Sequence, residues 1–566
     1  MSEFHDIPPQ ERCAAAQAVA IPVSIRHQFP VSYRVLVTDE IDADGVALLV
    51  AEPDLKIDEV PTLPKEDLLA RIGDYDAIIG RSATRISPEL LRAARRLRVV
   101  GRAGVGVDNI ALDVATELGI AVVNAPAGNS VAVAELVFGA LLNVLRGLSH
   151  ATVSMREGKW TRADLMGTEL NRKTLAIVGL GRIGGEVAVR AAAFGMKVVA
   201  YDPYVADARF QSLRVDRLAT LDAALDVADV LTVHTPLTAE TRGMIGRREI
   251  ARLGAGAIVV NMARGGIVDE HALVDALRDG RLRAAAVDAF EKEPLPADSP
   301  LRAVPNLHLT PHIGASTMEA QRNVSVDACS AVRDALLRGE LSRSINIAEI
   351  GATRWNELQP TLDLARKLGA VSRALLASQG ARAVGAIDVR TGAALADARA
   401  ALVASAAVGV LQAVMEEERL NIINARAIAQ ARGIELAFTE STQAEGQHAV
   451  EVRVRGGMQE IGVAGIALPG ATPRLTRIGA FRVDVQPRDT LLILTNRDVP
   501  GVIGRVGTLL GHAGVNIAEY HQARLAQGGE ALAAVSVDGP IPENVRASLL
   551  ELPDIHSATV LTFRDT

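Results

Sequence analysis

The chain has 566 residues, which at about 150 residues per domain predicts three or four domains rather than one compact core. Its 60 basic and 67 acidic residues give a formal net charge of −7, and no run of Lys or Arg is dense enough to suggest a nucleic-acid partner. Apolar residues make up 49% of the chain but aromatic residues only 3%. Disordered and collagen-like architectures are therefore excluded, and we expect aliphatic cores of the kind found where helices cover both faces of a sheet.

The two cysteines, Cys13 and Cys329, cannot make a disulfide framework and lack the paired spacing of a zinc site. We therefore expect no metal and a reducing compartment, the cytoplasm. Residues 131–148 form the most apolar long stretch, but charged residues interrupt it, so we expect a buried helix and no membrane contact. We expect residues 1–32 to form a loose N-terminal extension, without a signal peptide and without an assigned function.

Short apolar runs alternate with helical segments from Arg34 onwards, which is the pattern of parallel βαβ units. One series ends near Asn124, and a second series follows a long helix that begins near Asn129. A further helix over 316–338 has no strand partner in the second series, so we expect it to pack back on the first. The pattern predicts two doubly wound parallel-sheet domains: a flavodoxin-like domain (33–128 and 317–345) and a Rossmann domain (129–316).

The residue pattern changes beyond Asn346, where the alternation of short strands and helices stops. Ala-rich helical periodicity over 358–379 and 394–418 precedes alternating segments such as 448–454, which predicts an α+β domain over 346–488. The last stretch, 489–566, has the order strand, helix, strand, strand, helix, strand, which predicts a ferredoxin-like unit.

A Gly-x-Gly-x-x-Gly motif follows a predicted strand and opens a helix expected over 186–194. Gly179 permits a tight turn, Gly181 lets backbone N–H groups approach a pyrophosphate, and Gly184 allows close helix–strand contact. The next predicted strand ends at Asp202, whose carboxylate can accept hydrogen bonds from both ribose hydroxyls and would repel a 2′-phosphate. The motif therefore predicts NAD rather than NADP as the cofactor, with backbone contacts from Arg182 and Ile183.

Three titratable residues follow later strands of this domain, where an open parallel sheet places its ligands: Arg264, Glu293 and His312. A base must take the hydroxyl proton when hydride leaves a secondary alcohol, and His has a reference pKa of about 6.5. A carboxylate would orient that ring, and a guanidinium would clamp a substrate carboxylate. Taken singly, each residue is better explained as a solvated or structural side chain. Together, behind a dinucleotide motif, they favour catalysis.

The chain resembles the D-isomer-specific 2-hydroxyacid dehydrogenases from Arg34 to Phe563. The residues that carry the resemblance are the Gly motif, His234-Thr-Pro-Leu237, Ala263-Arg-Gly-Gly-Ile-Val-Asp-Glu270 and Pro311-His-Ile-Gly-Ala-Ser316. Within that family it is most similar to the long members that oxidise D-3-phosphoglycerate to 3-phosphohydroxypyruvate with NAD, the first step of phosphorylated L-serine biosynthesis.

The resemblance implies cofactor contacts at fifteen positions: Gly179, Gly181, Arg182, Ile183, Gly184, Asp202, Thr235, Met262, Ala263, Arg264, Asp288, His312, Ile313, Gly314 and Ala315. Val105 also belongs to the cofactor site, and it stands where relatives often have Thr, so one hydroxyl contact is missing. Substrate contacts are implied at Arg81, Ser82, Arg102 and Asn124, with Arg162 reaching a phosphate across a subunit interface.

The terminal unit resembles an ACT domain, a small amino-acid-binding module, and 346–488 resembles the intervening domain of the long dehydrogenases. The ACT resemblance implies an L-serine effector site at Asn496, Asp498 and Asn516 and feedback control, although such domains also serve only to assemble subunits. The resemblance also implies a homotetramer.

Two other functions remain open: a dehydrogenase of an unphosphorylated acid such as 2-hydroxyglutarate or glycerate, and a nicotinamide-sensing binding protein. The arginines at positions 81, 85, 102 and 162 favour a phosphorylated substrate, and the ACT-like end disfavours the sensor.

Overall fold

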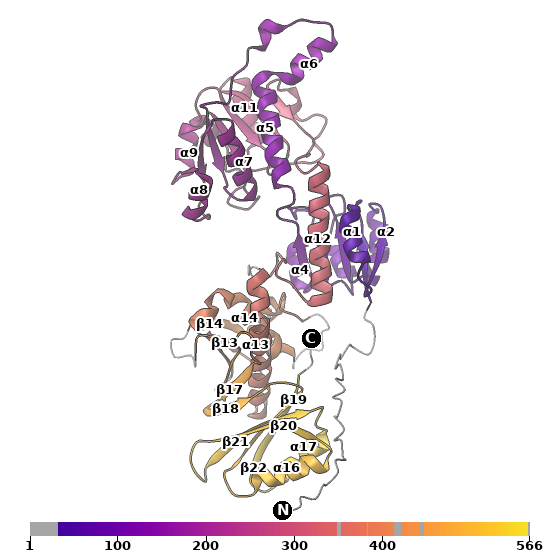
Figure 1. Cartoon of the computed structure of the whole chain (residues 1–566), viewed down its shortest axis with the longest axis vertical. Helices are drawn as coiled ribbons and strands as arrows, with labels where there is room; N and C mark the ends of the chain where they lie inside the picture. The colour runs from indigo at the N-terminus through magenta and orange to yellow at the C-terminus, as the bar shows by residue number, and fades with distance from the viewer. Residues whose placement is uncertain (1–31, 348–351, 382, 413–419, 441–445, 564–566) are drawn as a thin grey trace, which may run out of the picture.

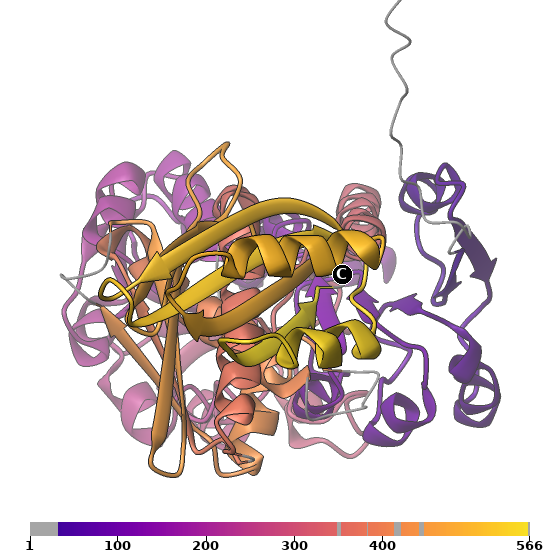
Figure 2. The same ribbon diagram turned by 90° about the horizontal axis from the view of Figure 1, so that it is seen from below.

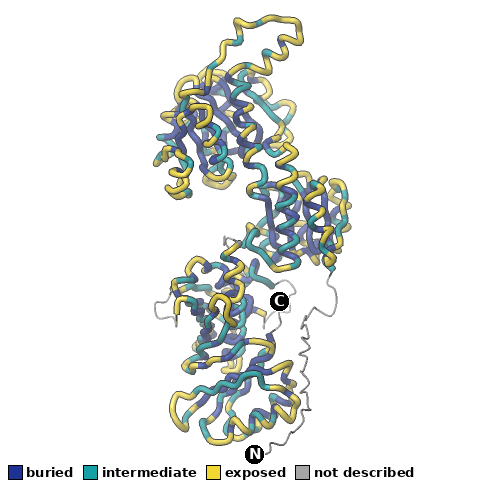
Figure 3. The backbone as a smooth tube through the Cα atoms, viewed as in Figure 1, coloured by how far each residue is buried: buried dark blue, intermediate teal, exposed yellow. Residues whose placement is uncertain are grey.

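The computed structural model describes residues 32–347, 352–381, 383–412, 420–440 and 446–563. The N-terminal extension expected over 1–32 lies outside the described residues except for Ser32. Four sheets lie along the long axis of the molecule, and Figure 3 shows buried residues around each of them; the third and fourth sheets share one buried cluster.

The first sheet has five parallel strands in the order β2-β1-β3-β4-β5, the flavodoxin-like order. The helices α1 and α12 cover one face, and α2, α3 and α4 cover the other. The strands are β1 (Tyr33–Val37), β2 (Leu55–Glu59), β3 (Ala77–Gly80), β4 (Val99–Arg102) and β5 (Ala121–Asn124). The helices are α1 (Ala43–Val50), α2 (Lys65–Arg71), α3 (Pro88–Ala93), α4 (Leu112–Glu117) and α12 (Met318–Arg338).

The second sheet has seven parallel strands in the order β12-β11-β10-β9-β6-β7-β8, so the order reverses between β6 and β9. Ligands of open parallel sheets bind beyond the carboxyl ends of the strands at such a reversal. The strands are β6 (Thr174–Val178), β7 (Lys197–Tyr201), β8 (Asp216–Arg217), β9 (Val230–Val233), β10 (Ala257–Asn261), β11 (Leu282–Val287) and β12 (Leu307–Leu309).

Helices cover both faces of the second sheet. One face packs against α5 (Ser130–Arg146), α7 (Arg182–Ala193) and α8 (Asp207–Leu213), and the other against α9 (Leu221–Val227), α10 (Arg247–Arg252) and α11 (Glu270–Arg278). Beyond α5, the helix α6 (Leu148–Arg156) and the short helix η2 (Arg162–Leu165) form an arm that projects from this unit (Figure 1). On this arm Trp160 and Met166 are 79% and 88% exposed.

The third sheet is mixed, in the order β14-β13-β15-β16-β17-β18, and only β13 and β14 pair in parallel. Its strands are β13 (Ala386–Thr391), β14 (Glu435–Glu440), β15 (Ala449–Gly456), β16 (Gln459–Ile466), β17 (Arg474–Ile478) and β18 (Phe481–Val485). Its helices are α13 (Ala352–Ser378), η4 (Ala393–Ala398), α14 (Arg399–Gln412) and α15 (Ala425–Ala431). The helix expected over 394–418 is thus two helices, and 413–419 lie outside the described residues.

The fourth sheet is antiparallel, in the order β20-β21-β19-β22, and Figure 2 shows two helices lying across its outer face. Its elements are β19 (Thr490–Arg497), α16 (Val502–His512), β20 (Asn516–Arg524), β21 (Glu530–Asp538), α17 (Glu543–Leu550) and β22 (Ile555–Thr562). The opposite face of this sheet shares one buried cluster with the third sheet, in which Leu491 and Ile493 join Val450 and Val452.

These sheets confirm the predicted fold class: α/β, with two parallel sheets, a mixed sheet and an antiparallel sheet. Among the described residues, the helical stretch Ala393–Gln412, formed by η4 and α14, is long and apolar enough to cross a bilayer, and 72% of its apolar window is buried inside the fold. The helices α5 and α6 meet the same test only when taken together, across a bend of 62°.

Candidate active site

The glycine motif forms the turn between β6 and α7. Gly179 has φ +94°, a left-handed conformation that favours glycine, and a Cβ at Gly184 would overlap the carbonyl oxygen of Gly179. A Cβ at Gly181 would meet nothing within 4 Å, so open space lies in front of the helix N-terminus. The helix α7 begins at Arg182, four residues before the expected start, because its first turn tolerates the glycines that suggested a longer loop.

Asp202 lies directly after β7, and three backbone N–H groups fix its carboxylate. Leu180 of the glycine turn donates to Oδ2 at 2.8 Å, while Tyr204 and Val205 donate to Oδ1 at 2.9 and 3.2 Å. The carboxylate is thereby attached to the glycine turn, next to the start of α7.

His312 and Glu293 form a close pair. The Nδ1 atom of His312 lies 2.9 and 2.8 Å from the two carboxylate oxygens of Glu293, and Glu293 also accepts a hydrogen bond from the backbone of Phe290 at 2.9 Å. A carboxylate on Nδ1 favours the tautomer that carries its proton there, which leaves Nε2 as an acceptor. His312 has φ +54°, and its ring lies at the cavity described below.

Asp288 holds the backbone around this histidine. Its buried carboxylate accepts hydrogen bonds from the N–H groups of Ile313 at 2.9 Å and Gly314 at 2.8 Å, and from the hydroxyl of Thr310 at 2.6 Å. These hydrogen bonds to Asp288 stabilise the left-handed backbone conformation at His312 and thereby fix the direction of its ring.

Arg264 follows β10 and reaches the first sheet. Its Nε donates to Asp108 at 3.1 Å and its Nη1 donates to the carbonyl of Ala263 at 2.7 Å. The remaining terminal nitrogen lies against Gly106, where a Cβ would collide with it. The guanidinium therefore stands between the two parallel-sheet units, with one edge held by protein acceptors.

Arg102 ends β4 close to two other cations. Burial, together with the positive charges of Arg264 and Arg81, lowers the pKa of its guanidinium to about 10. Its Nε is buried without a hydrogen-bond partner in the described part of the chain. The carboxylates of Asp108 and Asp39 oppose this lowering of the pKa of Arg102, but the three guanidinium groups outnumber them, and the excess positive charge suits an anionic ligand.

The loop that carries Arg81 and Ser82 is held by a buried carboxylate that the sequence pattern did not single out. Asp39 accepts hydrogen bonds from the N–H groups of Arg81 at 2.7 Å and Thr84 at 2.9 Å, and from the hydroxyls of Thr62 and Thr84. Asn124, the fourth expected substrate residue, donates to the carbonyl of Val105 at 2.6 Å.

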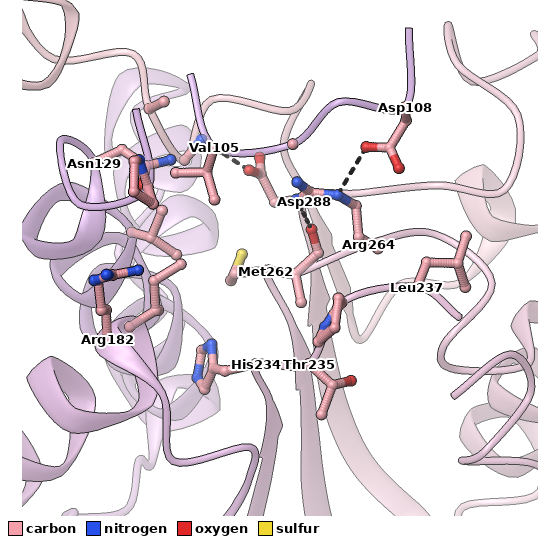
Figure 4. Close-up of a pocket in the computed structure, with 18 of the residues that line it drawn as sticks. Val105, Asp108, Asn129, Arg182, His234, Thr235, Leu237, Met262, Arg264 and Asp288 are labelled. Atoms are coloured by element: carbon pink, nitrogen blue, oxygen red, sulfur yellow. Dashed lines mark hydrogen bonds and ion pairs between the residues drawn. The ribbon is translucent and has the colours of Figure 1, made fainter. Parts of the chain in front are cut away.

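A cavity of about 430 Å³ lies between the two parallel-sheet units, at the reversal of strand order (Figure 4). Arg182 and Asn129 lie on one side of it, and Arg264 and Asp108 on the other. The expected site residues that line it are Arg102, Val105, Arg182, Ile183, Thr235, Met262, Ala263, Arg264, Asp288, His312, Gly314 and Ala315.

Other expected residues do not line this cavity: Arg81, Ser82, Asn124, Gly179, Gly181, Gly184, Asp202, Glu293, Ile313 and Arg162. Most of them adjoin lining residues, but Arg162 lies on the projecting arm. Lining residues that sequence reasoning missed include Asp108, Asn129, Val133 and His234. For Asn129, the one feature of the sequence that could have indicated a site residue was its position at the start of a long helix after a strand.

Buried polar atoms on the cavity wall fit a dinucleotide. The hydroxyl of Thr235, Nδ1 of His234 and Oδ1 of Asn129 are buried without hydrogen-bond partners among the described residues. Burial lowers the pKa of His234 to about 4, so its ring is neutral at pH 7, and its Nε2 lies 2.9 Å from the hydroxyl of Thr232. Together with the open space at Gly181, these groups offer hydrogen bonds to a ligand that spans the end of α7.

The three expected effector residues lie in the fourth-sheet unit. Asp498 accepts from Arg524 at 3.1 Å and from the backbone of Gly528 at 3.2 Å, and Asn516 donates to Asp538 at 2.6 Å. Asn496 is buried, and its Oδ1 lacks a partner among the described residues.

Two family models match the chain. Residues 138–314 match the NAD binding domain of the D-isomer specific 2-hydroxyacid dehydrogenases, and residues 357–479 match the intervening domain of D-3-phosphoglycerate dehydrogenase. Two solved structures resemble the first part of the chain. A protein designated TT0316 from Thermus thermophilus is 37% identical, covers 54% of this chain and 96% of its own, and has a TM-score of 0.50. A glyoxylate reductase from Paecilomyes thermophila is 31% identical, with coverages of 56% and 98% and a TM-score of 0.52.

Three relatives that span nearly the whole chain are named D-3-phosphoglycerate dehydrogenase. Those from Methanocaldococcus jannaschii, Bacillus subtilis and Mycobacterium tuberculosis (strain H37Rv) are 36%, 35% and 38% identical. The matches cover 93%, 94% and 93% of this chain and 99%, 99% and 98% of the relatives.

The two parallel sheets and the cavity at their junction, together with the matching NAD-binding domain, define an NAD-dependent 2-hydroxyacid dehydrogenase, which confirms the predicted cofactor. The sequence identity to the relatives extends beyond this core to the intervening and terminal units. The chain belongs to the D-3-phosphoglycerate dehydrogenase family.

Proposed function

We propose that this chain oxidises D-3-phosphoglycerate at C2 to 3-phosphohydroxypyruvate, with the hydride passing to NAD. The full-length relatives named D-3-phosphoglycerate dehydrogenase support this substrate. Bound NAD supplies the hydride acceptor, and the groups that would hold it are the start of α7, Asp202, Thr235 and the backbone from His312 to Ala315.

His312 acts as the general base in this proposal. Because Nδ1 donates to Glu293, the lone pair of Nε2 accepts the C2 hydroxyl proton while the C2 hydrogen leaves as hydride. The Glu293 carboxylate stabilises the positive charge that the ring acquires. Asp288 keeps the His312 ring in position because its carboxylate accepts hydrogen bonds from the backbone of Ile313 and Gly314.

The arginine cluster binds the two anionic ends of the substrate. Arg264 binds the carboxylate next to C2, and Arg81 with Ser82 and Asn124 binds towards the other end, where the phosphate lies. Arg102 stands between them. The main support is that the charges of Arg81 and Arg264 both act on the pKa of Arg102, since three neighbouring cations suit a substrate with two anionic groups.

The test is NADH formation by the purified full-length chain with D-3-phosphoglycerate, D-glycerate and D-2-hydroxyglutarate in parallel. The reverse assay uses phosphohydroxypyruvate with NADH. We expect a clear preference for phosphoglycerate that Arg81→Ala abolishes. Faster turnover of an unphosphorylated acid would instead assign that acid, and no turnover in either direction despite NADH binding would favour a nicotinamide sensor.

Feedback control is the second part of the proposal. We assign L-serine to the terminal unit, where the Asp498 carboxylate, the Asn516 amide and the unpartnered Oδ1 of buried Asn496 suit an amino-acid ligand. The same assay with millimolar L-serine tests it. Inhibition that Asp498→Ala removes is the expected result, and an unchanged rate would leave the terminal unit a structural role.

The remaining assignments are also proposals. They are a homotetramer in which Arg162 of the projecting arm reaches a neighbouring subunit's substrate phosphate, a cytoplasmic location, and domain limits at 33–128 with 317–345, 129–316, 346–488 and 489–566. The exposure of Trp160 and Met166 on the arm supports a subunit contact there.

A further inference from the structure

A second cavity, of about 540 Å³, lies at the edge of the first sheet opposite the active site. Its wall combines two parts of the chain that are far apart in sequence. One part is the run from Arg95 to Val99 with Asp76 and the end of α12, and the other is the segment from Leu420 to Ile423 ahead of α15. The proposed function makes no use of this cavity.

The wall is cationic. Arg95, Arg96 and Arg98 all line it, and Asp76 is the only carboxylate among its lining residues in the described part of the chain. Asp76 is buried and already accepts hydrogen bonds from the backbone of Arg34 at 2.9 Å and from Arg96 at 3.0 Å. Three positive charges against one negative charge leave a local excess of two.

Two of the guanidinium groups are free for a ligand. Arg95 and Arg98 make no ion pair with any residue that the structure describes. The guanidinium of Arg98 lies over the ring of Tyr33, with 5.3 Å between its central carbon and the ring centroid. That contact covers a face of the guanidinium and leaves its N–H edges able to bind an anion.

The other wall of the cavity is fixed in place. Asn421 donates from Nδ2 to the carbonyl of Gly119 at 2.7 Å, and its own Oδ1 accepts from the backbone of Ile423 at 2.9 Å. Ile423 is 8% exposed and belongs to the buried cluster of the first sheet. The cavity therefore lies at a packed junction between two units, a common location for small-molecule sites.

The cavity is also connected to the active site by the sheet itself. It lies at the amino ends of β3, β4 and β5, where Asp76, Val99 and Ala121 line it. At their carboxyl ends the same three strands lead to expected substrate residues: Arg81 follows β3, and Arg102 and Asn124 are the last residues of β4 and β5. At about 3.3 Å per residue, four-residue strands separate the two edges by roughly 13 Å, so one ligand cannot occupy both sites.

We propose that this second cavity is a binding site for a small phosphorylated anion, held by the guanidinium groups of Arg95 and Arg98 between the first sheet and the intervening unit. Phosphate suits the site because guanidinium edges bind phosphate oxygens in pairs, and a charge of about −2 balances the local excess. The volume admits a ligand larger than inorganic phosphate alone.

The test is calorimetric titration of the full-length chain with inorganic pyrophosphate, and with citrate as an anion without phosphate. An Arg81→Gln background removes a guanidinium at the catalytic edge, so that binding there does not mask the second cavity. We expect binding to persist in that background and to weaken at least tenfold when Arg95→Gln and Arg98→Gln are added. The matched control is Arg278→Gln with Arg482→Gln, two exposed arginines that line neither cavity, and it should bind as the parent does.

Equal pyrophosphate affinity in the Arg95/Arg98 variant would overturn the site, and so would binding that disappears with Arg81→Gln alone. Citrate binding as tight as that of pyrophosphate would overturn the assignment to phosphate. If the double variant does not fold, as judged by NADH binding and the unfolding midpoint, Arg98→Lys takes its place. It keeps the charge but loses the paired donors, and it should weaken pyrophosphate binding severalfold.

Discussion

Arg264 and Asp108 connect the two parallel-sheet units across the mouth of the active-site cavity, with 3.1 Å between Nε and Oδ2. The arginine follows β10 of the second sheet, and the aspartate follows β4 of the first. Because Arg264 is also the proposed partner of the substrate carboxylate, Asp108 competes with the substrate for the same guanidinium.

Asp108→Asn should therefore lower KM for the hydroxy acid and leave kcat nearly unchanged. The side chain of Asp108 is 68% exposed, and ion pairs of such exposed groups contribute at most about 1 kcal/mol, so we expect a change of up to about fivefold. Initial-rate kinetics measure both constants, with Asp113→Asn as the control, a carboxylate in α4 away from the cavity. A higher KM would mean that Asp108 orients Arg264 rather than competing for it.

His312→Asn should reduce kcat by roughly 10²–10⁴-fold, because the variant lacks the base that takes the hydroxyl proton. Asparagine is chosen because φ at His312 is +54°, a region that Asn tolerates better than Ala. NADH fluorescence should show unchanged cofactor binding. Glu293→Gln should reduce kcat less, since the ring keeps a hydrogen-bond partner on Nδ1. Near-normal turnover of His312→Asn would refute the assignment.

Asp202→Asn should shift the cofactor preference towards NADP. The amide oxygen can still accept from the N–H groups of Tyr204 and Val205, while the N–H of Leu180 loses its acceptor, and the neutral side chain no longer repels a 2′-phosphate. A gain of about 1.4 kcal/mol for the phosphorylated cofactor corresponds to a tenfold change in the ratio of NADPH to NADH dissociation constants, which fluorescence titration measures. An unchanged ratio would place the ribose away from Asp202.

Two glycines of the same turn should respond in opposite ways to alanine. At Gly184 the added methyl group would overlap the carbonyl oxygen of Gly179, so the fold should lose about 1–3 kcal/mol and unfold at lower temperature. At Gly181 the methyl group meets nothing within 4 Å, so thermal unfolding should not change, yet NADH should bind at least tenfold more weakly. Normal NADH affinity in Gly181→Ala would exclude that space from the cofactor site.

The buried ring of His234 predicts a loss of stability in mild acid. Its pKa is lowered to about 4 in the folded chain against 6.5 in the unfolded one, so the unfolded chain binds more protons as the pH falls between these values. The free energy of unfolding should decrease by about 3 kcal/mol over that range on account of this group. Urea unfolding of the wild type and of His234→Asn at several pH values measures it. The two curves should diverge in acid, whereas exposed His271→Asn should follow the wild type; parallel curves for His234→Asn would contradict the prediction.

The pattern of the sequence predicted most of the parallel strands because these are buried apolar runs bounded by turns, but it missed the short strands β8 (Asp216–Arg217) and β12 (Leu307–Leu309). It also missed β2 (Leu55–Glu59), an edge strand in which charged residues alternate with apolar ones and whose identity depends on pairing with β1. The start of α7 was placed too late because glycines disfavour helices locally, whereas the strand beside them requires that close approach.

The closeness of His312 and Glu293 was predictable because both residues follow strands of the same parallel sheet, and the carboxyl ends of such strands lie at one edge. The pairing of Arg264 with Asp108 was not, because it depends on how two separately folded units face each other. Asp39 was missed for a related reason: a lone aspartate after a strand looks like a turn residue until its four donors are seen.

The apolar cluster shared by the third and fourth sheets makes the C-terminal part of the chain one cooperative block. Leu491, Ile493 and Phe563 are buried there against residues of the intervening unit, so cutting the chain near residue 489 would strip a hydrophobic face from both fragments. If a truncated enzyme no longer responded to an effector, the loss could therefore come from damage to the intervening unit as well as from removal of the terminal unit. Point substitutions on the helix-covered side of the fourth sheet keep the block intact and separate these two causes.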